Sequence, residues 1–143
     1  SLHAALERVR PLAQARQIEL RARGLEAGAE VRAEAEDLEQ VWVNLLENAI
    51  QYSPPGETVE VECAAEGAAV AVSVRDHGCG IPAAQLPYIF DRFHRGPKSQ
   101  GFGLGLAIAR GIVEAAGGQL QVESSAAGTC LRAVLPAAVA PEA

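Results

Sequence analysis

Two glycine clusters, one of them opened by a carboxylate, carry the clearest chemical signal in this sequence. The first is DHGCG at residues 76–80, and the second is GFGLG at residues 101–105. Glycine lets a main chain approach a ligand closely and adopt positive φ angles without strain. The second cluster runs into a helical pattern at residues 106–110, so unpaired N–H groups and the positive end of a helix dipole lie at its glycines. Either cluster alone is commonly a tight turn, but together they favour a nucleotide site.

The helix predicted over residues 38–52 carries two asparagines in helical register. Asn44 and Asn48 are four residues apart, so they are neighbours on a polar side that also includes Glu47. A solvated face is the simpler explanation, although asparagine is a poor helix former and two in register are unusual. Amide oxygens are hard, neutral ligands that suit Mg²⁺ beside substrate phosphates. Glu47 is a candidate general base, or a group that supports the metal site from outside.

The strand before the first cluster sets the direction of Asp76. Val70, Val72 and Val74 alternate with small or polar residues, and Asp76 continues their even-numbered series. Successive side chains of a strand point to opposite faces, so the carboxylate is expected to point inward at the strand's end. A carboxylate in that position needs a partner.

The remaining periodicity predicts an α+β fold, a two-layer sandwich in which about three helices cover one face of a mixed, mostly antiparallel sheet of about five strands. Asp37 is expected to cap the second helix, with Gln40 completing a capping-box-like pattern. The predicted elements are a helix at 2–16, strands at 18–22 and 31–34, a helix at 38–52, a hairpin turning at Glu66-Gly67, a helical turn near 86–90 within a loop at 83–100, a helix from Gly103 to about 116, and a hairpin of strands 119–124 and 129–135.

Composition narrows the class of protein. A chain of 143 residues with 49% hydrophobic content is expected to form one domain, and its net charge of −6 argues against a general nucleic-acid binder. No apolar run is long enough for a membrane span. The odd number of cysteines, without metal spacing, favours reduced thiols and a cytoplasmic location. Because the chain opens on Ser1 without a signal-peptide pattern, we expect a domain excised from a longer protein.

Four segments resemble the sequence boxes of sensor histidine kinases. NLLENAIQYSP at residues 44–54 is similar to the N box, and DHGCGIP at 76–82 to the G1 box. IFDRFHR at 89–95 resembles the F box, and GFGLGLAI at 101–108 the G2 box. With Gly128-Thr129, the resemblance covers residues 17–136 in the order and spacing of the GHKL superfamily, whose Bergerat-type ATP-binding fold is an α/β sandwich with a lid, here a short one.

The resemblance implies ATP and Mg²⁺ as the ligands of this chain. Asp76 would accept a hydrogen bond from the adenine amine, Asn48 would ligate Mg²⁺, and Thr129 would support Asp76. The implied catalytic positions are Asn44, Glu47 and Arg95. The implied nucleotide-binding positions are Asn44, Asn48, Tyr52, Asp76, Gly78, Gly80, Ile81, Arg95, Lys98, Gly101, Phe102, Gly103, Leu104, Gly105, Leu106 and Thr129.

The resemblance also implies a division of labour between domains. Residues 17–136 would be the catalytic domain, 137–143 a tail, and 1–16 either the end of a linker helix from a dimerisation domain or the first helix of the catalytic domain. None of the three histidines has an acceptor-like context, so the chain would transfer the γ-phosphate of ATP to a histidine on the dimerisation domain of the same protein. By itself it would be monomeric and inactive in autophosphorylation, without membrane contact, and a response regulator would act downstream.

Three other functions stay open at this point. GHKL ATPases of the gyrase, mismatch-repair or heat-shock type carry a glutamate four residues before the metal-binding asparagine; here that position is Asn44, which cannot act as a base. An anti-sigma serine kinase belongs to the same superfamily. A nucleotide-binding module without transfer is the third, because Gln51 stands where these kinases often carry Lys or Arg, and the lid segment at 94–100 is short.

Overall fold

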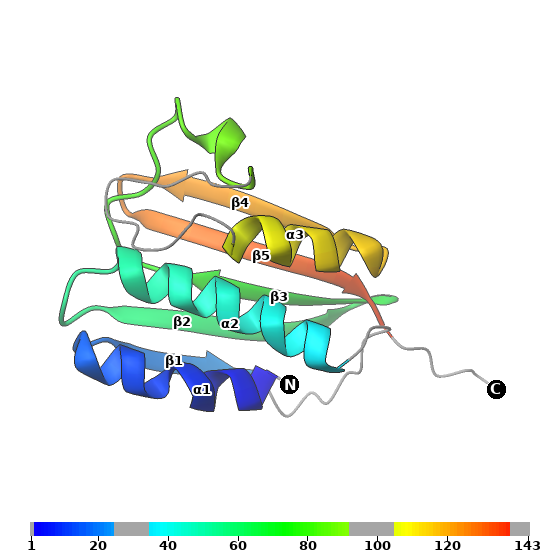
Figure 1. The fold of residues 1–143 in the computed structure, drawn as a ribbon, viewed down its shortest axis with the longest axis horizontal. Helices are drawn as coiled ribbons and strands as arrows, with labels where there is room; N and C mark the ends of the chain where they lie inside the picture. The colour runs from blue at the N-terminus through cyan, green and yellow to red at the C-terminus, as the bar shows by residue number, and fades with distance from the viewer. Residues whose placement is uncertain (1, 25–34, 92–104, 138–143) are drawn as a thin grey trace.

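The computed structural model describes residues 2–24, 35–91 and 105–137, which form two layers (Figure 1). Within these residues, three α-helices lie on one face of a five-stranded, open sheet, as the sequence predicts. The elements in chain order are α1 (Leu2–Ala15), β1 (Glu19–Arg23), α2 (Ala35–Tyr52), β2 (Thr58–Glu66), β3 (Ala69–Arg75), the 3₁₀ turn η2 (Leu86–Tyr88), α3 (Gly105–Ala115), β4 (Gln119–Ser125) and β5 (Gly128–Pro136). The strand expected at 31–34, and the start of the third helix expected at Gly103, lie outside the described residues.

The sheet is mostly antiparallel, with the strand order β1-β2-β3-β5-β4. β1 pairs with β2 in parallel, and the other three pairs are antiparallel. The two expected hairpins are present, and the first turns at Gly67, whose φ is +63°. This order places the end of β3 next to the start of β5, although the two segments are far apart in sequence (Figure 1).

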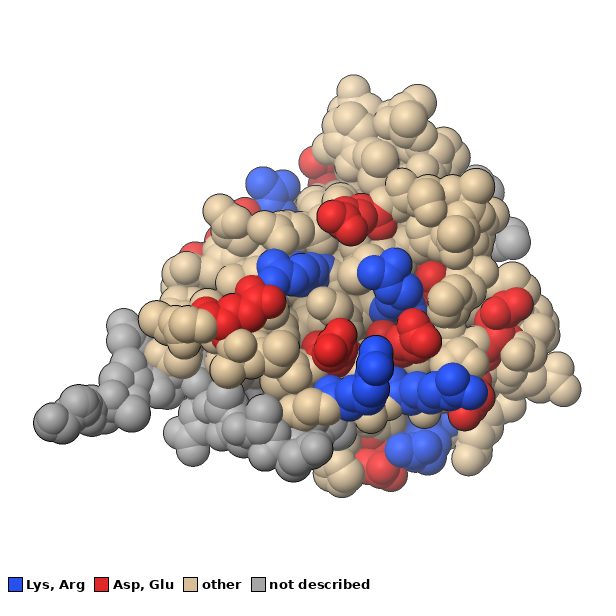
Figure 2. Space-filling model, turned by 180° about the vertical axis from the view of Figure 1, so that it is seen from behind, with Lys and Arg blue, Asp and Glu red and all other residues tan. Residues whose placement is uncertain are grey.

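One face of the sheet is apolar and the other is charged. Alternate residues such as Val59, Val61 and Val74 are buried under the helices. On the opposite face, Arg21 lies opposite Glu60, which in turn lies opposite Arg75. Basic and acidic side chains are accordingly interspersed on the side seen in Figure 2. Oppositely charged cross-strand neighbours stabilise this face and help to set its register.

Helix α2 lies in the middle of the helical layer, between α1 and α3 (Figure 1). Because helices flank it on both sides, its buried surface is wide and includes Val43 and Ile50 as well as Leu45 and Leu46. The expected cap was wrong: α2 begins at Ala35, so Asp37 lies within its first turn, where a negative charge complements the helix dipole. Gln40 does not form a capping box, because its side-chain amide bonds Asn44 one turn further along.

Helix α1 packs into the same core as α2. Its buried residues are Leu2, Ala5, Leu6, Val9 and Ala13. Arg16, just after this helix, donates from Nε to the carbonyl of Ile50 at 3.2 Å and from a terminal nitrogen to that of Gln51 at 3.1 Å. These carbonyls belong to the last turn of α2, which has no helical partners for them, so Arg16 caps the helix.

Among the described helices, none combines the length and the apolar character that crossing a membrane requires.

Candidate functional site

Three polar side chains form a row across three neighbouring strands, on the face of the sheet that the helices cover. Asp76 follows β3, Thr129 lies in β5, and Ser124 lies in β4 opposite Thr129. The Asp76 N–H donates to the Thr129 carbonyl at 2.8 Å, so the β3–β5 pairing continues through Asp76. Each of the three shares the parity of buried apolar residues in its own strand, such as Val74 and Leu131. The row therefore lies at the border between the apolar core and the loops.

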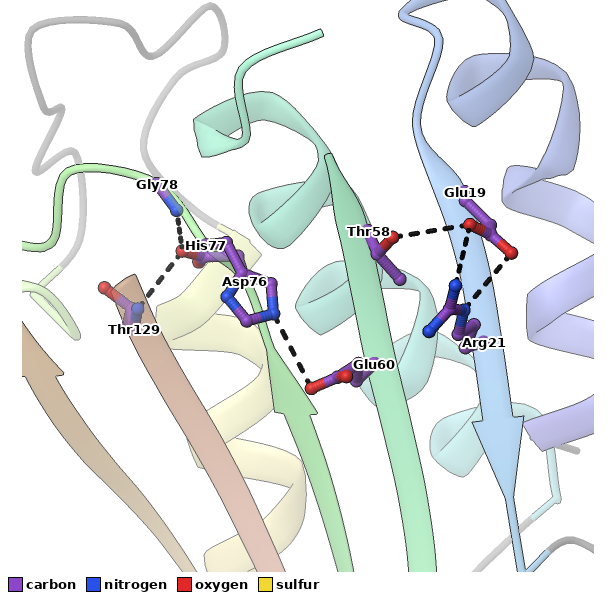
Figure 3. A network of polar contacts seen from close by, with 8 residues as sticks. All are labelled: Glu19, Arg21, Thr58, Glu60, Asp76, His77, Gly78 and Thr129. Carbon is purple, nitrogen blue, oxygen red and sulfur yellow. Dashed lines mark hydrogen bonds and ion pairs between the residues drawn. The ribbon is translucent and has the colours of Figure 1, made fainter. Parts of the chain in front are cut away.

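The Asp76 carboxylate is buried and held by the main chain (Figure 3). Only 4% of the residue is exposed, which confirms the inward direction expected from strand parity. Its Oδ1 accepts hydrogen bonds from the N–H of Gly78 at 2.9 Å and from that of Thr129 at 3.1 Å. Among the described residues, Oδ2 accepts none, so this oxygen is available to a ligand. The carboxylate is fixed in direction before any ligand arrives.

Burial raises the pKa of the Asp76 carboxyl above its ordinary value. Loss of hydration disfavours the charged form. Hydrogen bonds from the backbone of Gly78 and Thr129 act in the opposite direction, as do the charges of His77 and Arg75, but burial outweighs them. A carboxylate in such a position binds a hydrogen-bond donor strongly, because little water competes for it.

The loop after Asp76 passes close to two other main-chain segments, which explains its glycines. A Cβ atom on Gly78 would lie 2.2 Å from the carbonyl oxygen of Tyr52, at the end of α2. A Cβ atom on Gly80, whose φ is +83°, would lie 2.0 Å from the carbonyl oxygen of Ser125. The loop is then fixed by the N–H of Ile81, which donates to Ser124 Oγ at 2.6 Å. The first glycine cluster thus runs between the end of α2 and the β4–β5 hairpin.

His77 points away from the carboxylate and toward the solvent face. Its Nε2 lies 3.6 Å from Oε1 of Glu60 on β2 (Figure 3). The side chain is exposed.

The polar side of α2 is only partly open to solvent. Asn44 is 8% exposed, because α3 packs against it. Its Oδ1 accepts from the Gln40 side chain of the same helix at 2.9 Å, and its Nδ2 donates to the carbonyl of Gly105 in α3 at 3.0 Å. The two asparagines therefore differ, since Asn48 is half-buried and has no hydrogen bond among the described residues. Glu47 is exposed. Asn44 joins α2 to the first residue of α3, and Asn48 leaves its amide available.

The first turn of α3 points its unpaired N–H groups away from the helix. This turn begins with Gly105 and Leu106, next to Asn44. Tyr52 lies half-buried at the other end of α2, next to Gly78. Six expected site residues lie outside the described part of the chain: Arg95, Lys98, Gly101, Phe102, Gly103 and Leu104.

Two residues that the sequence reasoning missed help to build the site. Ser124 bonds both the Ile81 N–H and, at 3.0 Å, the hydroxyl of Thr129. The parity of Leu120 and Val122 in the same strand could have revealed its inward direction. Arg16 holds the last turn of α2, and nothing local in the sequence distinguishes it from other arginines.

The site combines a buried acceptor, the available amide of Asn48 and a helix N-terminus. The first selects a ligand that carries a hydrogen-bond donor, and the last favours an anionic group. No group of three or more His, Cys, Asp or Glu side chains within the described ranges could hold a metal ion. A metal at this site would therefore depend on amide oxygens and on the ligand's own oxygens.

Comparison with known proteins gives a consistent result. Residues 33–139 match the model of a family described as histidine kinase-, DNA gyrase B- and HSP90-like ATPase. Sensor protein KdpD of Escherichia coli K12 is 41% identical over 108 residues, covering 73% of this chain and 12% of that protein. Sensor protein SphS of Synechococcus elongatus is 37% identical over 139 residues, covering 88% of this chain and 33% of that protein. The chain thus spans a third or less of each of these relatives.

A solved structure agrees with these sequence relatives. The mycobacterial sensor histidine kinase MprB superposes with a TM-score of 0.79 at 31% identity, covering 95% of this chain and 91% of that one.

Proposed function

Since the chain belongs to the family of histidine kinase-, DNA gyrase B- and HSP90-like ATPases, as the ATP-binding catalytic domain of a sensor histidine kinase, we propose that it presents the γ-phosphate of ATP to a histidine on a separate dimerisation domain of the same protein. In this reaction the imidazole nitrogen forms a bond to the γ-phosphorus, the bond from that phosphorus to the bridging oxygen breaks, and ADP leaves. Catalysis of phosphoryl transfer depends mainly on positioning and on charge stabilisation.

The buried carboxylate of Asp76 is the observation that carries this proposal. With Oδ1 held by Gly78 and Thr129, its Oδ2 would accept a hydrogen bond from the exocyclic amine of adenine. Guanine has a carbonyl oxygen at the corresponding position, which would face the carboxylate and be repelled. Gly78 passes directly against the carbonyl of Tyr52, so the loop and the end of α2 would together form one wall of the base site.

Asn48 fits the role of the Mg²⁺ ligand. Its amide is half-buried on α2 and has no hydrogen bond within the described chain, so the oxygen is free to coordinate a cation. Mg²⁺ typically binds few protein ligands and keeps its other positions for water and phosphate oxygens, which agrees with a site that lacks a carboxylate cluster among the described residues. When bound, the ion would neutralise charge on the phosphates.

The phosphates would lie at the N-terminal turn of α3. Gly105 and Leu106 supply main-chain N–H groups there, and Asn44 fixes this turn against α2. Arg95, Lys98, and Gly101 to Leu104 would complete the phosphate contacts; for these residues the proposal rests on the sequence resemblance alone.

Glu47 is the proposed general base. It is exposed on α2, one residue before Asn48, where an incoming acceptor histidine could reach it. The unprotonated imidazole nitrogen would attack, and the carboxylate of Glu47 would take the proton from the other ring nitrogen. Asn44 occupies the place where hydrolytic relatives carry their glutamate, and both ends of its amide are already bonded. These two features support transfer to histidine over hydrolysis of ATP.

The packing supports a division of the chain. We assign residues 17–136 to the main body of the catalytic unit and 137–143 to a tail. Helix α1 contributes five buried residues to the common core, and this supports the assignment of residues 1–16 as the first helix of the catalytic unit, at the connection to the dimerisation domain. A response regulator would receive the phosphoryl group afterwards.

A reconstituted transfer assay tests this function. The chain incubated alone with γ-labelled ATP and Mg²⁺ should yield no acid-labile phosphoprotein, and it should behave as a monomer. Adding a sensor-kinase dimerisation domain that carries the acceptor histidine should produce labelled phosphohistidine, and an acceptor variant with that histidine replaced should not. Steady release of phosphate without any labelled acceptor would favour the ATPase alternative instead.

A further inference from the structure

We propose that Ser124 is a positioning residue that makes the site select adenine over guanine, by holding the hydroxyl of Thr129 as a hydrogen-bond donor toward the base. This inference rests on the proposed function, because it concerns how the same site recognises its nucleotide. It concerns a residue that belongs to no glycine cluster and to none of the sequence boxes.

Ser124 stands at one end of the row of polar residues. Asp76, Thr129 and Ser124 lie side by side on adjacent strands, and their hydrogen bonds are continuous. The Thr129 N–H binds Asp76 Oδ1 at 3.1 Å, and the Thr129 hydroxyl lies 3.0 Å from Ser124 Oγ. Thr129 is therefore in contact with both neighbours, through its backbone on one side and its side chain on the other.

The hydrogen bonds of Ser124 set the direction in which the Thr129 hydroxyl donates. Ser124 Oγ accepts the Ile81 N–H at 2.6 Å, a short bond that polarises the serine hydroxyl and makes it a better donor. Thr129 Oγ1 lies 3.0 Å away; either hydroxyl of this pair can donate, and we assign the donor role to Ser124. Once Thr129 accepts from Ser124, its own hydrogen is free, because no other hydrogen bond to this hydroxyl exists within the described residues. Ser124 thus turns Thr129 into a donor.

Adenine and guanine present opposite patterns of hydrogen-bond donors and acceptors. On adenine, the exocyclic amine is a donor and the adjacent ring nitrogen is an acceptor. On guanine, both are reversed: the exocyclic oxygen accepts and the adjacent ring N–H donates. A free acceptor on Asp76 beside a donor on Thr129 complements adenine, directly or through a bridging water, and opposes guanine at both places. Without Ser124, the Thr129 hydroxyl could rotate and accept from guanine.

Ser124 also fixes the loop that would cover the base. Its bond to Ile81 holds the loop after Gly80 against the β4–β5 hairpin, where Gly80 already passes the Ser125 carbonyl closely. The same side chain therefore controls both the direction of one hydroxyl and the position of the loop. Ser125, the next residue, is exposed and bonds only the Ala127 N–H in the turn, at 3.1 Å, which makes it a matched control.

Calorimetric titration of the 143-residue chain with ATP and with GTP tests the proposal. Ser124→Ala should reduce the preference for ATP, expressed as the ratio of the GTP and ATP dissociation constants, by about three- to tenfold. Ser124→Thr keeps the hydroxyl and should retain the preference, and Ser125→Ala should match the wild type. Thermal unfolding of each variant establishes that it is folded. If Ser124→Ala does not fold, Ser124→Cys, nearly the same in shape but weak in hydrogen bonding, should show the same loss of preference.

The outcomes separate this inference from the proposed function. A wild-type chain that binds neither nucleotide, or binds both equally, would contradict the adenine site itself. A wild type that prefers ATP, with a folded Ser124→Ala or Ser124→Cys variant that keeps this preference within about twofold, would overturn only the role of Ser124. A variant that is less stable yet equally selective would give Ser124 a purely structural role, and this also contradicts the proposal.

Discussion

Asp76 and Thr129 are joined by two hydrogen bonds of opposite direction. The Asp76 N–H donates to the Thr129 carbonyl at 2.8 Å, and the Thr129 N–H donates to Asp76 Oδ1 at 3.1 Å. The main chain of β5 thus fixes a buried carboxylate that extends beyond the end of β3. Burial raises the pKa of this carboxyl group, so its ionised form is expected to reduce the stability of the unliganded fold.

The first prediction concerns stability and pH at Asp76. Because the pKa of this acid is higher in the folded state, its protonated form contributes stability that is present below the ordinary carboxyl pKa of about 4. That contribution is lost as pH rises through the raised pKa. Asp76→Asn keeps an oxygen for the two N–H donors without the charge, so it should be more stable than the wild type at pH 7, and the difference should shrink toward pH 4. Thermal unfolding across this range measures it.

The same variant should bind nucleotide poorly. Losing the charged acceptor of the adenine amine should weaken ATP binding by about tenfold or more, which corresponds to about 1.4 kcal/mol. Glu62→Gln removes an exposed carboxylate from β2 and should change neither property. If stability depended on pH in the same way in Asp76→Asn and in the wild type, burial would not raise the pKa of this carboxyl group.

The second prediction concerns the last turn of α2. Arg16 bonds the carbonyls of Ile50 and Gln51, and removing its partly buried guanidinium takes away both bonds, leaving the Ile50 carbonyl with the longer, 3.4 Å bond from the Ser53 N–H. Arg16→Ala should lower the free energy of unfolding by about 1–2 kcal/mol. Arg8→Ala breaks only an exposed ion pair with Glu39 and should cost less than about 1 kcal/mol. Urea denaturation of both variants compares them; equal losses would mean that the helix cap contributes nothing special.

Periodicity in the sequence predicted the sheet and the direction of Asp76 because each strand has one apolar and one polar face. Alternation alone then decides which residues point inward, and the same rule applies to Ser124 at the end of β4. The β2–β3 and β4–β5 pairings followed from turn residues between neighbouring strands. Short sequence patterns were sufficient to predict these strand faces and hairpins, because residues close together in the sequence determine them.

Local pattern was insufficient for α2, because distant segments determine its environment. Asn44 is buried by α3, and its bond to Gly105 joins residues 61 positions apart. Arg16 acts on carbonyls more than thirty residues away. A helical wheel assigns one buried side to a helix, whereas two flanking helices bury further residues of α2, such as Val43, Asn44 and Ile50. Such contacts follow from the packing of the layer and have no signature within a short window.

The third prediction concerns Asn48 and the dependence of binding on Mg²⁺. If the free amide of Asn48 ligates the ion, Asn48→Ala should bind ATP about as well as the wild type in the presence of a chelator, and should lose most of the gain that Mg²⁺ provides. We expect that gain to fall by about tenfold. Calorimetric titrations with and without Mg²⁺ measure it, and unfolding data control for stability. An undiminished gain in the variant would assign the metal to other ligands.

The fourth prediction contrasts two glycines that differ in backbone conformation and in surroundings. Gly80 has a φ of +83°, and a Cβ atom there would lie 2.0 Å from the Ser125 carbonyl oxygen. Gly111 lies within α3, is exposed, and would place a Cβ atom in open space. Gly80→Ala should therefore destabilise the fold by about 2 kcal/mol or more and displace the loop that Ile81 and Ser124 hold, so ATP binding should weaken as well.

Gly111→Ala should instead stabilise the protein by about 0.5–1 kcal/mol, because alanine loses less conformational freedom in a helix than glycine does. Its nucleotide affinity should stay at the wild-type value. Denaturant unfolding and ATP titration of both variants, made side by side, give four values to compare. The decisive result is the difference in ATP affinity: if Gly80→Ala folds and binds as tightly as Gly111→Ala, the close passage of the loop beside the β4–β5 hairpin is irrelevant to the site, and the glycine serves the turn alone.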